Sequence, residues 1–128
     1  MPGEDIPLEI RQLVWRHIRS VEQLEILVLL WGNPTANWSV QTVYDIVLSA
    51  KPSVERWLEE FVRLGVLEKT MALPQTFRYV ATGETAAQFE ALVRLYKTKP
   101  VRVIETIFKR DQDPAQGFAD AFKIKKKP

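Results

Sequence analysis

The hydrophobic periodicity of this chain changes at Gly65, and this change constrains the fold more strongly than any other feature of the sequence. Ahead of Gly65, apolar residues such as Val54, Leu58 and Phe61 recur at the spacing of one helix face. After Gly65, the runs VLEKTMA and TFRYVA are rich in β-branched and aromatic residues and are separated by the turn-forming segment LPQ. Such a pair of runs predicts a two-stranded hairpin. We therefore expect a mainly α fold of the α+β class, in which one hairpin follows several helices.

Amphipathic helices are predicted on both sides of the hairpin. An apolar residue recurs every four positions from Ile6 to Ile18, and Ser20 with Gln23 fits a capping box that opens the next helix. The core is expected where the apolar stripes of the second and fourth helices meet, at Leu24, Leu27, Val28, Trp31, Trp57, Leu58 and Phe61. The expected helices cover about residues 7–18, 20–31, 40–49, 52–64, 84–96 and 100–108.

Residue types that usually carry catalysis are scarce. The chain has 0 Cys and 1 His, so it has no thiol nucleophile and no metal motif that needs two histidines. Its 5 Gly residues are too scattered to form a loop that binds phosphate. A site built only from carboxylates stays open, because distant Asp and Glu residues can converge in a fold. We expect no enzyme activity, no metal and no cofactor.

The sequence also predicts where the protein works. Its longest apolar stretch, residues 26–31, is far shorter than the roughly 20 residues that a membrane helix needs. The N-terminal segment MPGEDIPLEI is acidic, whereas a secretory signal begins with basic residues. The lack of Cys fits a reducing compartment. We expect a cytoplasmic protein that has no membrane partner.

Charge is distributed unevenly along the chain. Residues 1–93 carry 8 Lys and Arg against 12 Asp and Glu, a net charge of −4, whereas residues 94–128 carry 10 against 4, a net charge of +6. A short lysine run is often a solvated tail, but next to nucleic acid it adds affinity that does not depend on base sequence. The run in this chain consists of Lys123, Lys125, Lys126 and Lys127.

The stretch KPSVERWLEEFVRLGVLEKT resembles the recognition-helix signature of MarR-like bacterial winged helix-turn-helix regulators. It has a Ser at the helix start, apolar residues at helical spacing, and a Gly followed by two apolar residues that enter the wing: Ser53, Val54, Leu58, Gly65, Val66 and Leu67. The later segments ALVRLYKTKPVRVIETIF and FADAFKIKK are similar to the C-termini of small proteobacterial winged-helix proteins. We accordingly expect an N-terminal helical arm at residues 1–19, a winged helix-turn-helix domain at 20–82, C-terminal helices at 83–110 and a basic tail at 111–128.

The resemblance implies a transcriptional regulator that binds double-stranded DNA. In helix-turn-helix readers, the second helix enters the major groove with its N-terminal residues near the base edges, and other basic groups meet phosphates. By this resemblance, Ser53 and Arg56 approach the bases, and Gln41 and Thr42 contact phosphates. The cations expected beside them are Lys51 in the turn and, in the hairpin, Lys69 and Arg78.

Two features of the sequence favour a different function. On the exposed side of the candidate recognition helix, carboxylates outnumber cations, and the LPQ wing tip carries no cation. Carboxylates near phosphates weaken DNA binding, although a Glu can accept a hydrogen bond from cytosine N4. The alternative function is a protein-interaction module that kept the winged-helix scaffold and lost specific DNA readout. The acidic residues behind this alternative are Glu55, Glu59 and Glu60.

The flanking helices predict an assembly. The helices at residues 7–18 and 100–108 each carry an apolar stripe that needs a partner surface. In MarR-like proteins such flanking helices form a two-fold dimer, which lets two recognition helices reach two half-sites. We therefore expect a homodimer through the flanking helices, with packing of each arm on its own core as the alternative.

Overall fold

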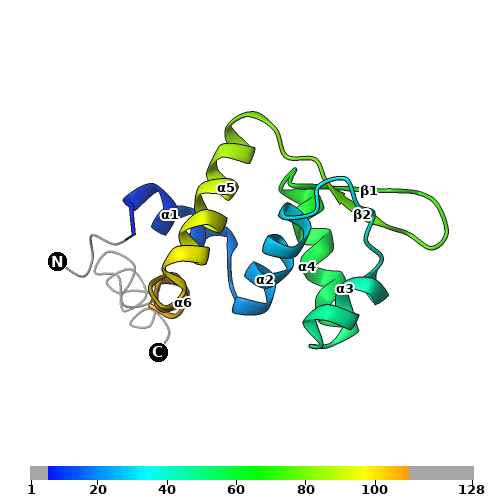
Figure 1. Cartoon of the computed structure of the whole chain (residues 1–128), viewed down its shortest axis with the longest axis horizontal. Helices are drawn as coiled ribbons and strands as arrows, with labels where there is room; N and C mark the ends of the chain where they lie inside the picture. Colours follow the sequence, from blue (N-terminus) through cyan, green and yellow to red (C-terminus); the bar gives the residue numbers. More distant parts are fainter. Residues whose placement is uncertain (1–5, 110–128) are drawn as a thin grey trace, which may run out of the picture. The chain divides into compact units, whose positions relative to one another are not determined.

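The computed structural model describes residues 6–109, which contain six helices and one two-stranded antiparallel sheet (Figure 1). The hairpin follows four helices and precedes two, which confirms the predicted α+β class and gives a winged-helix-like arrangement. The elements are α1 (Leu8–His17), α2 (Val21–Trp31), α3 (Val40–Val47), α4 (Lys51–Arg63), β1 (Leu67–Lys69), β2 (Phe77–Tyr79), α5 (Gly83–Thr98) and α6 (Pro100–Phe108). Residues 20–94 form one compact unit, and residues 6–19 with 95–109 form another. Every helix within residues 6–109 is too short or too polar to span a membrane.

The core of the unit formed by residues 20–94 includes the facing sides of α2 and α4. Leu24 and Leu27 of α2 and Leu58 and Phe61 of α4 each have at most 1% of their surface exposed, as the two apolar stripes predict. The Phe61 ring also meets the Phe89 ring of α5 edge-on, with 6.3 Å between the ring centroids. This packing determines which face of α4 points to solvent.

Three residues of the predicted core are only half-buried: Val28, Trp31 and Trp57. The indole of Trp57 carries a polar N–H that needs a hydrogen-bond partner, and it finds a carboxylate of α2 at the edge of the core. The ring of Trp31 lies 5.7 Å from the guanidinium carbon of Arg94, which is a cation–π contact near the surface. The prediction that both tryptophans are buried is therefore wrong, because each one keeps a polar or charged partner near the surface.

The helix-turn-helix consists of α3, residues 48–50 and α4. Ser39 and Thr42 form a capping box at the start of α3, in which each backbone N–H donates to the other side chain, at 2.9 and 3.1 Å. Leu48 has a left-handed backbone with a φ of 58°, which ends α3 two residues before the predicted boundary. α4 begins at Lys51, and Pro52 lies in its first turn, where an N–H has no helical partner to lose.

A glycine cap connects α4 directly to the wing. Gly65 has a φ of 81°, and the N–H groups of Gly65 and Val66 donate to carbonyl groups in the last turns of α4. β1 and β2 then pair in antiparallel register. On the other side of β2, Trp38 exchanges two backbone hydrogen bonds with Phe77, at 2.8 and 2.7 Å. The wing is therefore tied to the segment that precedes α3.

The second unit pairs α1 with α6. Val14 of α1 and Ile107 of α6 have at most 2% of their surface exposed, so both helices bury one apolar face. Trp15 Nε1 donates to the backbone carbonyl of Thr106 at 3.0 Å, which ties the two helices together. The N- and C-terminal flanking helices of the sequence are thus neighbours in the fold.

Candidate nucleic-acid interface

The N-terminal half of α4 exposes two cations. Lys51 and Arg56 are both exposed, and neither forms an ion pair with a carboxylate of residues 6–109. The Lys51 ammonium lies 5.5 Å from the centre of the Tyr44 ring, and the Arg56 guanidinium carbon lies 4.9 Å from the centre of the Trp57 ring. Contacts of this kind orient a cation without cancelling its charge. The positive charge of both side chains is therefore accessible to a ligand.

A carboxylate of α2 joins that helix to the start of α4. Glu22, in the first turn of α2, accepts hydrogen bonds from Ser49 Oγ at 2.5 Å, from Ser53 Oγ at 2.6 Å and from Trp57 Nε1 at 3.2 Å. Ser49 precedes α4, whereas Ser53 and Trp57 lie in its first two turns. These four residues form the Glu22 clamp. Hydrogen bonds to a charged acceptor are stronger than those between neutral groups, so the clamp restrains the start of α4.

The clamp also changes the acidity of Glu22. Burial acts to raise the pKa of Glu22, but the hydrogen bonds from Ser49, Ser53 and Trp57, together with the positive charge of Arg56, lower it by more. The pKa of Glu22 therefore lies below its ordinary value of 4.5. At neutral pH the clamp contains an ionised carboxylate.

Three residues predicted to contact DNA have their polar groups engaged within the protein. Ser53 is half-buried and donates its hydroxyl to Glu22. The hydroxyl of Thr42 belongs to the α3 capping box, and Gln41 Nε2 donates to Asp45 Oδ1 at 2.7 Å. Gln41 and Thr42 are nevertheless exposed at the start of α3, whereas Ser53 points toward α2.

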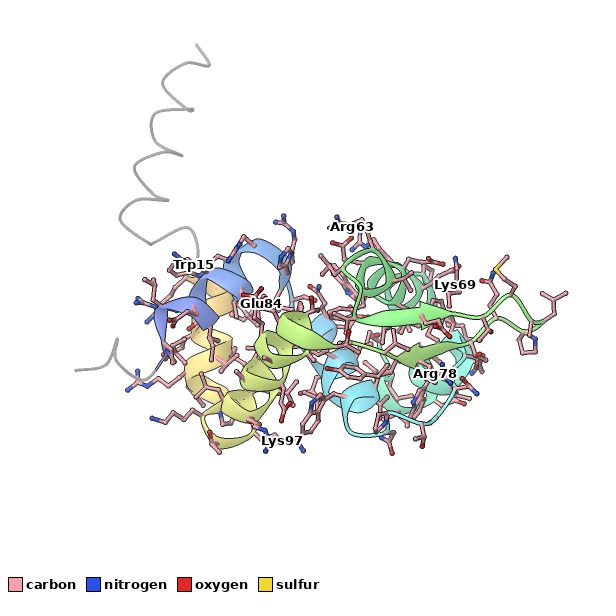
Figure 2. The ribbon with its side chains drawn as sticks, turned by 90° about the horizontal axis from the view of Figure 1, so that it is seen from above. Trp15, Arg63, Lys69, Arg78, Glu84 and Lys97 are labelled. Carbon is pink, nitrogen blue, oxygen red and sulfur yellow. The ribbon has the colours of Figure 1, made fainter. Side chains whose placement is uncertain are left out.

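The cations of the wing are paired with carboxylates. Lys69 Nζ lies 2.8 and 3.0 Å from the two oxygens of Glu59, and Arg78 Nη2 lies 3.2 Å from Glu68 Oε2. In the hairpin register Glu68 is opposite Arg78, and Lys69 is opposite the buried Phe77, so the two cations lie on opposite faces. Figure 2 shows Lys69 beside β1 and Arg78 beside β2. The structure does not bring the two predicted wing cations together.

The tip of the wing is apolar and exposed. The backbone N–H of Thr70 donates to the carbonyl of Thr76 at 2.8 Å, and the two hydroxyl oxygens lie 2.9 Å apart, which closes the loop. Within the loop, Met71 is 84% exposed and Leu73 is 93% exposed. The loop extends away from α3 and α4 of the same unit (Figure 1). A partner that contacts this loop therefore meets apolar side chains and no charged ones.

An apolar groove lies between α2 and α3 of the same unit. Its volume is about 370 Å³, and Ile46, which is 57% exposed, forms part of its wall. The groove also explains why Val28 is only half-buried. The lining residues are Glu25, Val28, Leu29, Ile46 and Val47.

The unit that holds the candidate interface is acidic as a whole. Residues 20–94 contain 6 Lys and Arg against 9 Asp and Glu, which gives a net charge of −3. Of the four cations predicted for the interface, Lys69 and Arg78 have carboxylate partners. The lysine run at Lys123, Lys125, Lys126 and Lys127 lies outside the described residues.

Glu22 is not among the site residues that the sequence predicts. A signal for it exists, because Ser49, Ser53 and Trp57 are hydrogen-bond donors that recur every four residues. This spacing indicates a donor stripe on one side of α4 but not its acceptor, which lies 27 to 35 residues earlier in the chain.

Comparison of the chain with protein-family models, curated proteins and solved structures gave no match. Within residues 6–109, no group of three His, Asp or Glu side chains is placed to hold a metal ion.

Proposed function

We propose that residues 20–94 bind double-stranded DNA as a winged helix-turn-helix transcriptional regulator, with the N-terminal half of α4 in the major groove. The observation that carries this proposal is the exposure of Lys51 and Arg56 on the half of the helix that reads bases in such proteins. Arg56 reads a base edge, for which O6 and N7 of guanine are the usual acceptors. Lys51, at the helix start, meets a phosphate. The MarR-like resemblance of the sequence supports the same function.

The wing contributes little affinity in this mode of binding. A phosphate that approaches Lys69 or Arg78 also approaches the carboxylate that each cation contacts. Separating a partly exposed ion pair costs only about 0–1 kcal/mol, but the carboxylate then stays close to the phosphate and repels it. Affinity that is independent of sequence comes from the C-terminal lysine run instead.

We propose further that the DNA-bound form is a homodimer. Leu8 of α1 and Val101 and Phe108 of α6 are 53%, 65% and 67% exposed, which supports association of the flanking helices with a second copy. Two copies place two recognition helices on half-sites roughly 34 Å apart. Sedimentation equilibrium of the intact chain tests this proposal, and a monomer at high micromolar concentration would contradict it.

Binding titrations on two duplexes test the proposed function. The selected duplex is the sequence that the intact protein enriches from a random duplex pool, and the unrelated duplex has the same length and another sequence. We expect the intact protein to prefer the selected duplex and Arg56→Ala to abolish that preference, because alanine cannot reach a base edge. Arg63→Ala is the matched control, since Arg63 is an exposed cation at the other end of α4. It should keep the preference.

The same titrations, repeated over a range of salt, separate specific from unspecific binding. Replacement of the four lysines of the C-terminal run by Gln should flatten the slope of log affinity against log salt by about 0.9 for each phosphate that the protein no longer neutralises. The preference for the selected duplex should persist. An intact protein that binds neither duplex at low salt would contradict the proposed function.

A second candidate function is a protein-interaction module, and the wing tip favours it. Met71 and Leu73 present exposed hydrocarbon where a DNA-binding wing usually carries cations, and the unit has a net charge of −3. Both features suit an uncharged or basic protein surface better than a phosphate backbone. A folded protein without DNA affinity at low salt would favour this candidate over the first.

A further inference from the structure

The Glu22 clamp restrains the first two turns of α4, where Arg56 is exposed. Ser53 and Trp57 both donate to Glu22 Oε1, and Ser49 donates to Oε2. The three donors are four residues apart, so one acceptor holds the turn before α4 and the first two turns of the helix. This arrangement opposes rotation of α4 about its own axis.

Trp57 connects the clamp to Arg56. One edge of the indole donates Nε1–H to Glu22 at 3.2 Å, while the guanidinium carbon of Arg56 lies 4.9 Å from the centre of the same ring. The carboxylate therefore fixes the ring, and the ring is the surface against which Arg56 rests. The charge of Glu22 also attracts Arg56 directly. Loss of this acceptor oxygen frees the ring and, with it, Arg56.

We infer that Glu22 is a positioning residue for DNA reading: through Trp57, Glu22 determines where Arg56 meets a base. This inference rests on the proposed function of residues 20–94 and deepens it, because it assigns part of the sequence selectivity of α4 to a side chain of α2. Ser53 acts in this arrangement as a member of the clamp. Its hydroxyl holds α4 to α2 rather than reading a base.

Glu22 influences DNA binding in two opposite ways. Its charge lowers the affinity for every duplex, whereas its positioning of Arg56 raises the preference for one duplex over another. A carboxylate near phosphates weakens binding, so loss of its charge alone raises affinity for every duplex. Loss of the position of Arg56 lowers the preference for one duplex over another. Two variants separate these effects: Glu22→Gln removes the charge but keeps an oxygen that can accept from Ser53 and Trp57, whereas Glu22→Ala removes the charge and every acceptor.

The experiment compares the affinity ratio between the selected and the unrelated duplex in the intact chain and in both variants. We expect Glu22→Ala to lower the ratio by about tenfold or more, which is the effect of weakening one good base contact. Glu22→Gln should keep the ratio within about threefold of the intact chain. Glu84→Gln is the control, since it removes an exposed carboxylate of residues 20–94 that lies in α5, outside both the clamp and α4. It should leave the ratio of the two affinities unchanged.

A further variant and a folding control keep selectivity apart from stability. Trp57→Phe retains a ring beneath Arg56 but lacks the N–H donor, so its ratio should fall in the same direction as that of Glu22→Ala. Thermal unfolding followed by circular dichroism defines a temperature at which every variant is folded, and the titrations are made there. A loss of stability alone then leaves the ratio unchanged.

The outcomes distinguish this inference from the proposed function. If Glu22→Ala keeps the ratio of the intact chain, or if Glu22→Ala and Glu22→Gln lower it equally, the positioning role is overturned and the proposed function stands. An intact chain that enriches no sequence from the random pool has no sequence preference, and this result overturns the proposed function and the inference with it.

Discussion

The start of α4 and the wing use carboxylates in different ways. At the start of α4, Glu22 accepts hydrogen bonds from neutral donors, and the charges of Lys51 and Arg56 remain exposed. In the wing, the carboxylates contact the cations themselves, at 2.8 Å for Lys69 and 3.2 Å for Arg78. The two regions thus contain the same kinds of side chain and differ in how these are paired.

A count of cations therefore does not by itself identify a surface suited to DNA. A carboxylate that binds hydroxyl and indole donors makes a helix rigid and leaves neighbouring cations available. A carboxylate that contacts a cation cancels its charge and stays close to any phosphate that binds there. The DNA contact that we propose is therefore assigned mainly to α4 rather than to the wing.

The largest effect is expected from a substitution in the core beneath both α4 and the wing. Leu58 of α4 has 0% exposure, and α4 contacts both α2 and β1. Leu58→Ala should lower the free energy of unfolding by about 2–5 kcal/mol, because it deletes buried methyl groups and leaves a cavity. Urea denaturation measures this change, with Arg63→Ala on the exposed side of α4 as a control that breaks only the ion pair with Glu60 and should cost less than about 1 kcal/mol. An unchanged urea midpoint in Leu58→Ala would contradict the placement of Leu58 in the core.

The next largest loss of stability is expected at the start of α4. Glu22→Ala removes the acceptor of three hydrogen bonds, and we expect it to lower the free energy of unfolding at pH 7 by about 1–2 kcal/mol, a value reduced for solvent screening because Glu22 is only half-buried. Urea denaturation again provides the measurement. If Glu22→Ala is as stable as the intact chain, the Glu22 hydrogen bonds do not stabilise the start of α4, and this prediction is wrong.

The stability of the same region should depend on pH through Glu22. The pKa of Glu22 is lower in the folded protein than its ordinary value of 4.5, so its ionised form stabilises the fold above that pH. This stabilisation is lost as the pH falls through the pKa of the folded state. The difference in unfolding free energy between the intact chain and Glu22→Gln should therefore shrink below pH 4.5. Urea midpoints at a series of pH values test this, and a constant difference would contradict it.

A smaller effect is expected in the wing. Lys69→Met breaks the ion pair with Glu59, which is partly exposed, and should lower the free energy of unfolding by about 0.2–1 kcal/mol. A double-mutant cycle with Glu59→Gln isolates the pair, and its coupling should weaken at high salt. A coupling as large as the effect of Glu22→Ala would erase the contrast between the two regions.

The smallest effect is expected at the wing tip. Met71 and Leu73 are almost fully exposed, so replacing both with Ser should change the free energy of unfolding by no more than about 0.5 kcal/mol. Thermal unfolding measures the change. A clear loss of stability would mean that the tip packs against another part of the protein.

The fold was largely predictable because its signals are local. The spacing of Leu58 and Phe61 identifies the buried face of α4, and the change of periodicity at Gly65 locates the wing. Helix ends were less predictable. Leu48 adopts a left-handed backbone that its residue type does not indicate, and α3 therefore ends earlier than its apolar pattern.

The helical and extended patterns of the sequence assign Arg56 to one helix and Lys69 and Arg78 to one hairpin, so the elements that carry the candidate cations are predictable from residue spacing. What each cation meets depends on the tertiary structure. Ion pairs and hydrogen bonds form between atoms about 3 Å apart, and this distance depends on how separate elements pack rather than on spacing along the chain. Glu22 and Trp57 are 35 residues apart in sequence and 3.2 Å apart in the fold. For that physical reason the acidic residues could be counted from the sequence, but their opposite roles at α4 and in the wing could not.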